Sequence, residues 1–189
     1  MITAIDKNTA LVLIDLQNMV LMNTAAHSFD DVLANANKLV DAFRNKNLPI
    51  VLVNVKPKGA VWMKARKEVN MPAIPDDENF FKITDKLHKQ SSDIYITKHT
   101  WNAFFETPIQ DELKKHNITG IVLGGVSTSI GVEGTARAAS ELGYNISFAL
   151  DAMTDRLLEA HNHSVKNIFP RIGETGSTGD IIAMLDATV

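Results

Sequence analysis

Short apolar segments rich in β-branched residues recur along this chain and alternate with longer segments of helical spacing. The five clearest short segments are Ala10–Ile14, Ile50–Val55, Ile94–Thr97, Ile118–Leu123 and Asn145–Leu150. Their residues are almost continuously apolar instead of alternating with polar ones, which is typical of strands covered on both faces in a parallel sheet. The alternation of such strands with helices predicts an α/β fold.

Two of the intervening segments have clear helical features. From Val32 to Phe43, apolar residues fall on one helix face, and Asp30 or Ser28 is expected to be the N-cap. A second helix is expected over Ser129–Gly143, with Ser129 as its N-cap.

The C-terminal segment adds a sixth strand around Arg171–Thr175 and a last helix over Thr178–Leu185. These elements together predict a three-layer α/β/α sandwich with a six-stranded parallel sheet, a Rossmann-like arrangement. A length of 189 residues suits one domain spanning the whole chain.

Composition excludes several classes of protein. The formal net charge of −3 argues against nucleic-acid binding, which needs a concentrated basic surface. No segment approaches the roughly 20 apolar residues that cross a bilayer, and the N-terminal residues lack the basic start of a signal peptide. We therefore expect a cytoplasmic protein without a membrane partner. The absence of cysteine excludes disulfides, thiolate metal ligands and a thiol nucleophile.

One long segment, Lys56–Lys82, interrupts the strand–helix alternation with prolines, charges and several large apolar residues. Segments of this length are usually disordered or functional loops. Trp62, Met63, Phe80 and Phe81 favour an ordered loop that either covers a substrate or contacts a second subunit.

Polar residues at the ends of the predicted strands are candidates for chemistry, because ligands of parallel sheets bind at the carboxyl ends of strands. Asp15 follows the first strand directly, where partial burial raises a carboxyl pKa and suits a general acid or base. Lys98 ends the third strand and can hold Asp15 ionised or bind a substrate anion. The segment Gly124–Gly131 joins the fourth strand to a helix start, whose N–H groups favour anions.

These motifs together resemble the isochorismatase-like hydrolases, also called the cysteine hydrolase superfamily, and are most similar to its bacterial YecD-type members. The matching segments run in order along the whole chain: ALVLIDLQN with Asp15, ITKHTWNAFFET with Lys98, GGVSTSIGVEGTARAASELGY, and SFALDAMTD with Asp151. In the amidases of that superfamily a cysteine attacks the substrate carbonyl with an aspartate as base. Gly131 occupies the cysteine position here, so thiol chemistry is excluded.

The resemblance implies a hydrolase of a small anionic metabolite without a cofactor. True isochorismatases also lack the cysteine and cleave a vinyl ether, with the aspartate as acid. Asp15, Lys98 and Gly131 are accordingly the expected catalytic positions, with backbone N–H groups near Gly131 binding the substrate. The expected substrate-binding residues are Gln17, Trp101, Val126, Ser127, Thr128 and Ile130. The resemblance further implies a cis peptide bond between Val126 and Ser127, and a homodimer or homotetramer.

Other chemistries are disfavoured. A hydroxyl nucleophile is unexpected, because none of Ser127, Thr128 and Ser129 occupies the cysteine position. The zinc ligands of the nicotinamidases have no counterpart in VLVNVKPKG, so no metal is expected. His161 and His163 should point to different faces of a helix, as surface or interface groups.

Of two alternatives to hydrolysis, one stays open and the other is disfavoured by the sequence. A protein that kept the fold after losing its nucleophile would bind a small molecule, or assemble, without turnover. A nicotinamide-dependent oxidoreductase would need the glycine fingerprint of dinucleotide-binding folds, which this sequence lacks.

Overall fold

The computed structural model describes residues 1–18, 24–69, 74 and 76–188. Its centre is a six-stranded sheet in which neighbouring strands pair in parallel, with the strand order β3-β2-β1-β4-β5-β6. The strands are β1 (Thr9–Ile14), β2 (Ile50–Val55), β3 (Ile94–Lys98), β4 (Gly120–Val126), β5 (Asn145–Thr154) and β6 (Glu174–Gly176). The predicted six-stranded parallel sheet is confirmed.

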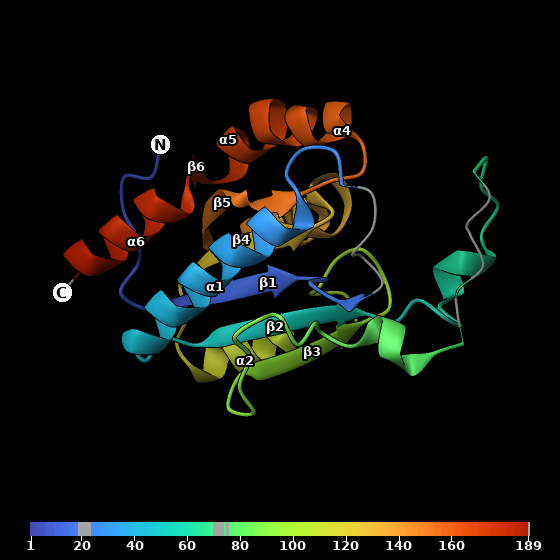
Figure 1. Cartoon of the computed structure of the whole chain (residues 1–189), viewed down its shortest axis with the longest axis horizontal. Helices are drawn as coiled ribbons and strands as arrows, with labels where there is room; N and C mark the ends of the chain where they lie inside the picture. The colour runs from blue at the N-terminus through green and yellow to red at the C-terminus, as the bar shows by residue number, and fades with distance from the viewer. Residues whose placement is uncertain (19–23, 70–73, 75, 189) are drawn as a thin grey trace.

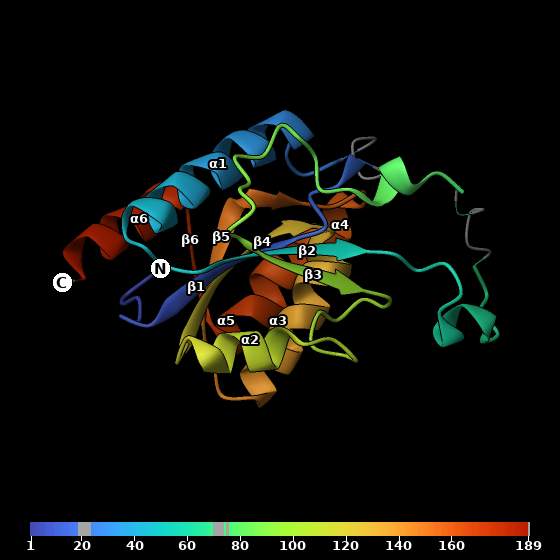
Figure 2. The same ribbon diagram turned by 90° about the horizontal axis from the view of Figure 1, so that it is seen from below.

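Helices cover both faces of the sheet, as Figures 1 and 2 show. The α-helices are α1 (Phe29–Asn45), α2 (Ile109–Lys115), α3 (Glu133–Glu141), α4 (Leu158–His163), α5 (Phe169–Ile172) and α6 (Thr178–Ala187). Helices α1 and α6 pack on one face, and α2, α3 and α5 on the other. The three predicted layers are therefore present.

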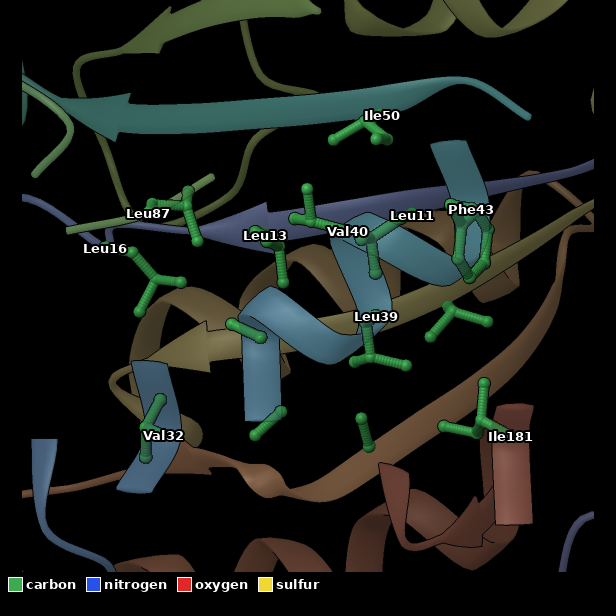
Figure 3. Close-up of a cluster of buried hydrophobic side chains, with 14 of the residues drawn as sticks. Leu11, Leu13, Leu16, Val32, Leu39, Val40, Phe43, Ile50, Leu87 and Ile181 are labelled. Atoms are coloured by element: carbon green, nitrogen blue, oxygen red, sulfur yellow. The ribbon is translucent and has the colours of Figure 1, made fainter. Parts of the chain in front are cut away.

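Burial of apolar side chains on both faces holds the layers together. On the α1 face, Leu11 and Leu13 of β1 pack with Leu39 and Phe43 of α1, all of them with no solvent exposure (Figure 3). Residues of β1 that point the other way join a second cluster under α2, α3 and α5. This two-sided burial explains why β1 has no alternation of polar and apolar residues.

Helix α1 matches the prediction closely, and its N-cap is Ser28, whose side chain accepts a hydrogen bond from the N–H of Asp31. Helix α6 begins with a capping box formed by Ser177 and Asp180. Both caps satisfy N–H groups that the first helical turn leaves without partners.

The predicted end of the fourth strand at Leu123 is wrong, because β4 continues through two glycines to Val126. These glycines allow neighbouring strands to approach closely. A Cβ atom on Gly124 would lie 2.9 Å from the carbonyl oxygen of Ala152, and one on Gly125 would lie 2.1 Å from that of Ile14. Gly125 also has a φ of +119°, which side chains disfavour.

Two other strand boundaries differ from the prediction by three or more residues. Strand β5 runs to Thr154 instead of Leu150, because its register against β4 shifts at Leu123–Gly125 and pairing then resumes. Strand β6 starts at Glu174 instead of Arg171, since the preceding residues complete helix α5.

The strand order fixes where a ligand site can form. The chain adds β2 and β3 on one side of β1 and then places β4 on the other side. The carboxyl ends of β1 and β4 thus border the topological switch point, where ligands of open parallel sheets bind. Asp15 follows β1, and Ser127 follows β4.

The described parts of the long segment after β2 project beyond the carboxyl ends of the strands (Figures 1 and 2). Its described part contains two 3-10 helices, η2 (Val61–Lys64) and η3 (Glu78–Phe81). Ion pairs of Lys56 with Glu78 and of Lys58 with Asp76 link its two ends. No helix in the described ranges is long and apolar enough to cross a membrane.

Candidate functional site

Asp15 and Lys98 meet at the carboxyl end of the sheet, although they come from β1 and β3. Lys98 Nζ donates to Asp15 Oδ2 at 2.7 Å and to the carbonyl oxygen of Thr100 at 3.1 Å. Asp15 is 6% exposed and Lys98 is 1% exposed. Asp15 has a φ of 51°, so its backbone turns directly at the strand end. From the sequence we expected Asp15 and Lys98 to lie near each other at the edge of the sheet, and in the structure their side chains form a hydrogen bond.

The environment of the Asp15 carboxyl favours its neutral form. Burial raises its pKa from 3.8 to about 6, and the charge and hydrogen bond of Lys98 partly oppose this rise. Oδ1 is buried and has no hydrogen-bond partner among the described residues. A buried acceptor without a partner is costly, and it is positioned to receive a proton or to contact a bound molecule.

Gly131 lies against this carboxyl group. A Cβ atom on Gly131 would lie 3.2 Å from Asp15 Oδ2, 2.9 Å from Ile14 Cγ2 and 3.3 Å from the carbonyl oxygen of Val126. A side chain at this position would therefore point at Asp15, but two other groups already occupy part of the space. The structure brings together all three expected catalytic positions.

The turn that carries Gly131 begins with a cis peptide bond between Val126 and Ser127, as the family resemblance implied. The helix then starts as a π-helical turn, η4 (Thr128–Val132), which continues into α3. Ser129 is not the N-cap, contrary to the prediction, because the cap position is Ser127. The hydroxyl of Ser129 instead donates to Asp155 Oδ2 at 2.8 Å.

The backbone N–H groups of this turn are unequally available. The N–H of Ser129 donates to Asp155 Oδ2 at 2.8 Å. The N–H groups of Ile130 and Val132 both donate to the carbonyl oxygen of Ser127, each at 3.1 Å. These three N–H groups are engaged by the protein and are not available to a bound anion.

The other expected substrate-binding residues occupy different environments. Gln17 is fully buried, and its amide bonds at both ends to the backbone of Val55 in β2. Val126 and Thr128 are buried, and Ser127 is half-buried. Trp101 and Ile130 are exposed at the rim.

A cavity of about 620 Å³ adjoins the segment that follows Lys98. It is lined by Lys58, Gly59, Ala60, Val61, Trp62, His99, Thr100, Phe105 and Glu106. Trp62 bridges the two sides, since its Nε1 donates to the carbonyl oxygen of His99 at 2.7 Å and its ring contacts Trp101 edge-on. The carbonyl group that anchors Lys98 belongs to Thr100, so the cavity lies beside the buried ion pair.

Two buried residues behind the turn, Asp155 and His161, are absent from the predicted site. The expectation that His161 is a surface group is wrong: it is 6% exposed and bonds through Nδ1 to Thr128 Oγ1 at 2.8 Å. His163, two residues later, is exposed, as different helix faces require. Asp155 directly follows β5 as Asp15 follows β1. A polar residue directly after an apolar strand is the signal that identified Asp15. The same signal identifies Asp155 once β5 is known to end at Thr154.

No group of three or more potential metal ligands occurs among the residues that the structure describes. The side chains and backbone groups gathered at the switch point are a buried carboxyl group, an ammonium group and N–H groups. This set can move a proton at Asp15 and hold a negative charge at Lys98 and the turn.

Comparison with known proteins identifies relatives along almost the whole chain. Residues 9–180 match the model of the isochorismatase domain. The chain is 40% identical over 182 residues to the isochorismatase family protein YecD of Escherichia coli O157:H7, covering 95% of this chain and 97% of YecD. It is 37% identical over 184 residues to YwoC of Bacillus subtilis strain 168, covering 93% of each chain.

Solved structures agree with these sequence matches. An isochorismatase family protein from Burkholderia thailandensis superposes with a TM-score of 0.93 at 35% identity, covering 97% of this chain and 98% of that chain. A cysteine hydrolase from Pseudomonas syringae pv. phaseolicola 1448A superposes with a TM-score of 0.83 at 18% identity, over 96% and 94% of the two chains. The second likeness shows a shared fold.

Proposed function

The chain belongs to the isochorismatase family, and from that premise we propose that it hydrolyses a small anionic metabolite through acid catalysis by Asp15. The observation that carries this proposal is the Asp15 carboxyl group, which is buried, has a pKa raised to about 6 and has one oxygen without a partner among the described residues. A carboxyl group in this state can donate a proton near neutral pH.

The absence of cysteine restricts the reaction. Amide hydrolysis through an acyl-enzyme needs a nucleophilic side chain, and Gly131 offers none. An enol ether needs only a proton and water. Asp15 transfers its proton to the terminal carbon of the enol ether, and water adds to the resulting oxocarbenium carbon and returns a proton to Asp15. The hemiketal then breaks into an alcohol and a ketone, so that all atoms balance.

Lys98 has two functions in this scheme. Its charge keeps the Asp15 pKa from rising further, so that the carboxylate remains able to accept the returned proton. Two of its three ammonium N–H groups have partners among the described residues, Asp15 and Thr100. We assign the remaining N–H to a substrate carboxylate.

The turn supplies the second anion contact. The N–H groups of Thr128 and Gly131 stand at the start of the continuous helix η4–α3, where the helix dipole favours negative charge. Val126, Ser127 and Ile130 line this side of the proposed site, and Trp101 lies at its rim. Gln17 is assigned a supporting role, because both ends of its amide are bound to Val55.

The test uses 2-methoxyacrylate, a minimal anionic enol ether whose hydrolysis releases pyruvate and methanol. Pyruvate is measured through NADH oxidation by lactate dehydrogenase, with the purified chain and with its Asp15→Asn variant. We expect pyruvate release by the native chain, a rate that falls about tenfold for each pH unit above 6, and no release by the variant. Asp151→Asn changes a carboxylate within β5 that accepts hydrogen bonds from Thr178 at the start of α6, and this control should keep the activity.

Parallel assays with acetamide and methyl acetate separate the alternatives. Amide or ester hydrolysis without enol-ether hydrolysis would contradict acid catalysis by Asp15, as would unchanged activity of Asp15→Asn. Saturable binding of 2-methoxyacrylate by calorimetry without any turnover would instead support a binding protein that kept the hydrolase fold.

A homodimer or homotetramer remains a prediction from the resemblance. Exposed apolar residues at the carboxyl rim, among them Val61, Trp101 and Leu157, are consistent with a subunit contact. Sedimentation of a monomer at micromolar concentration would contradict it.

A further inference from the structure

A group of polar side chains, three of them buried and two half-buried, lies where the turn meets the end of β5 and helix α4. We call it the support cluster: Thr128 and Ser129 of the turn, Asp155 after β5, His161 of α4, and His27 before α1. Thr128, Asp155 and His161 are each at most 6% exposed. Burying polar groups is costly unless they are hydrogen-bonded, so the partners of each member of this cluster matter.

Asp155 fixes the middle of the turn. Its Oδ2 accepts hydrogen bonds from both the N–H and the hydroxyl of Ser129, each at 2.8 Å. Its Oδ1 accepts from the N–H of Leu157 at 3.2 Å, and its backbone carbonyl accepts from the N–H of Ala25 at 2.7 Å. One residue therefore ties the turn to β5, to the approach to α4 and to the segment before α1.

His161 fixes the residue before Ser129. Its Nδ1 and Thr128 Oγ1 are 2.8 Å apart, and its ring contacts the His27 ring edge-on with centroids 5.5 Å apart. His27 is itself held, because its Nδ1 lies 2.8 Å from the carbonyl oxygen of Met153 and must carry the proton. Burial and the neighbouring His27 lower the pKa of His161, and Asp155 partly opposes this.

A second contact links the same helical region to α3. Ser164, which follows α4, donates from its hydroxyl to Glu133 Oε2 at 2.6 Å. Glu133 is the first residue of α3, two residues after Gly131. The turn is thus bound to the α4 region at both of its ends and to Asp155 at its middle.

We propose that Asp155 and His161 are positioning residues that press the turn Ser127–Gly131 against Asp15 and so keep water away from that carboxyl group. They act through Ser129 and Thr128 and touch neither Asp15 nor the substrate. The proposal rests on the proposed function, because acid catalysis near neutral pH depends on the proton that the Asp15 carboxyl group retains.

The link between the cluster and Asp15 is geometric. Gly131 lies so close to Asp15 that an added Cβ would be 3.2 Å from Oδ2. Burial is the largest cause of the raised Asp15 pKa. If the turn withdraws from Asp15, water gains access, the burial effect weakens and the pKa falls toward 3.8.

The experiment measures the Asp15 titration by carbon-13 NMR of the side-chain carboxyl groups, without any substrate. Asp155→Ala removes the contact to Ser129, and His161→Leu removes the contact to Thr128. We expect both variants to lower the Asp15 midpoint by roughly half a pH unit or more. His161→Asn places an amide near the position of Nδ1 and should retain the native midpoint.

Matched controls separate positioning from a general loss of stability. His163→Leu changes an exposed histidine two residues further along and should leave the Asp15 midpoint unchanged. A merely structural role of the cluster would lower the thermal midpoint of Asp155→Ala and His161→Leu and leave their native-state Asp15 titration as it is. That result would overturn the proposal.

Milder substitutions cover the case in which Asp155→Ala does not fold. Thr128→Val keeps the shape of the side chain but removes its hydroxyl, and Thr128→Ser keeps the hydroxyl. A lowered Asp15 midpoint in the first variant but not in the second supports the proposal, and equal midpoints contradict it. Since no substrate is present, absence of enol-ether hydrolysis would refute only the proposed function.

Discussion

The raised pKa of Asp15 makes a quantitative prediction about stability. In the folded chain Asp15 keeps its proton up to about pH 6, whereas its ordinary value is 3.8. Between these values the folded state binds the extra proton, so the free energy of unfolding falls as pH rises. A difference of about 2 pKa units corresponds to about 3 kcal/mol. This contribution is fully present below pH 3.8 and is lost as pH rises through about 6.

The substitution Asp15→Asn keeps the size of the side chain and removes its ionisation. Relative to the native chain, the variant should therefore gain about 3 kcal/mol in unfolding free energy between about pH 3.5 and about pH 7. Urea titrations followed by circular dichroism at a series of pH values give both curves. The test uses how the difference in unfolding free energy between the two chains changes with pH. A constant offset between the two curves is expected as well, because Asp15→Asn also alters the contact with Lys98.

A control variant with the opposite sign strengthens this measurement. Asp85 is exposed, and its hydrogen bond with Lys89 lowers its pKa. Asp85→Asn should therefore lose a small amount of stability relative to the native chain as pH rises through the carboxyl range. A constant difference between Asp15→Asn and the native chain at all pH values would refute the assignment of a buried, proton-retaining Asp15.

Three further substitutions, with Gly143→Ala as a control for the third, test the packing around Asp15 and the end of β1. Lys98→Met should raise the Asp15 pKa above about 6, because the lysine acts only to lower it; carboxyl NMR measures the change, and a fall would contradict the ion pair. Gly131→Ala should cost roughly 1–3 kcal/mol in a urea titration, since its Cβ meets groups at 2.9–3.3 Å. Gly125→Ala should prevent folding, because its Cβ would lie 2.1 Å from a β1 carbonyl oxygen. Gly143→Ala, with positive φ but nothing within 4 Å, should cost only roughly 1–2 kcal/mol, and circular dichroism compares the two.

The strands and the proposed catalytic positions are predictable because their signals are local. Continuous apolar runs mark strands buried on both faces, and Asp15 and Lys98 stand where such runs stop. Parallel strands bring their carboxyl ends to one edge, so proximity of Asp15 and Lys98 follows without knowledge of the packing. The cysteine-free composition is enough by itself to exclude thiol catalysis.

Two of the incorrect predictions, the end of β4 and the exposure of His161, have a common cause. The glycines after Leu123 indicate the end of a strand, yet they extend β4 because their missing side chains allow Ile14 and Ala152 to approach. The spacing of His161 and His163 favours surface positions, yet His161 is buried against Thr128. In each case the environment is created by a segment far away in the sequence, which local periodicity does not describe.

The sequence by itself determined the α/β class, the strands and the chemical groups that end them, because burial on two faces dictates composition. The tertiary structure decided the strand order that sets β1 beside β4, and with it the contact between Gly131 and Asp15. It also decided the pKa of Asp15, since desolvation depends on every element packed around a carboxyl group.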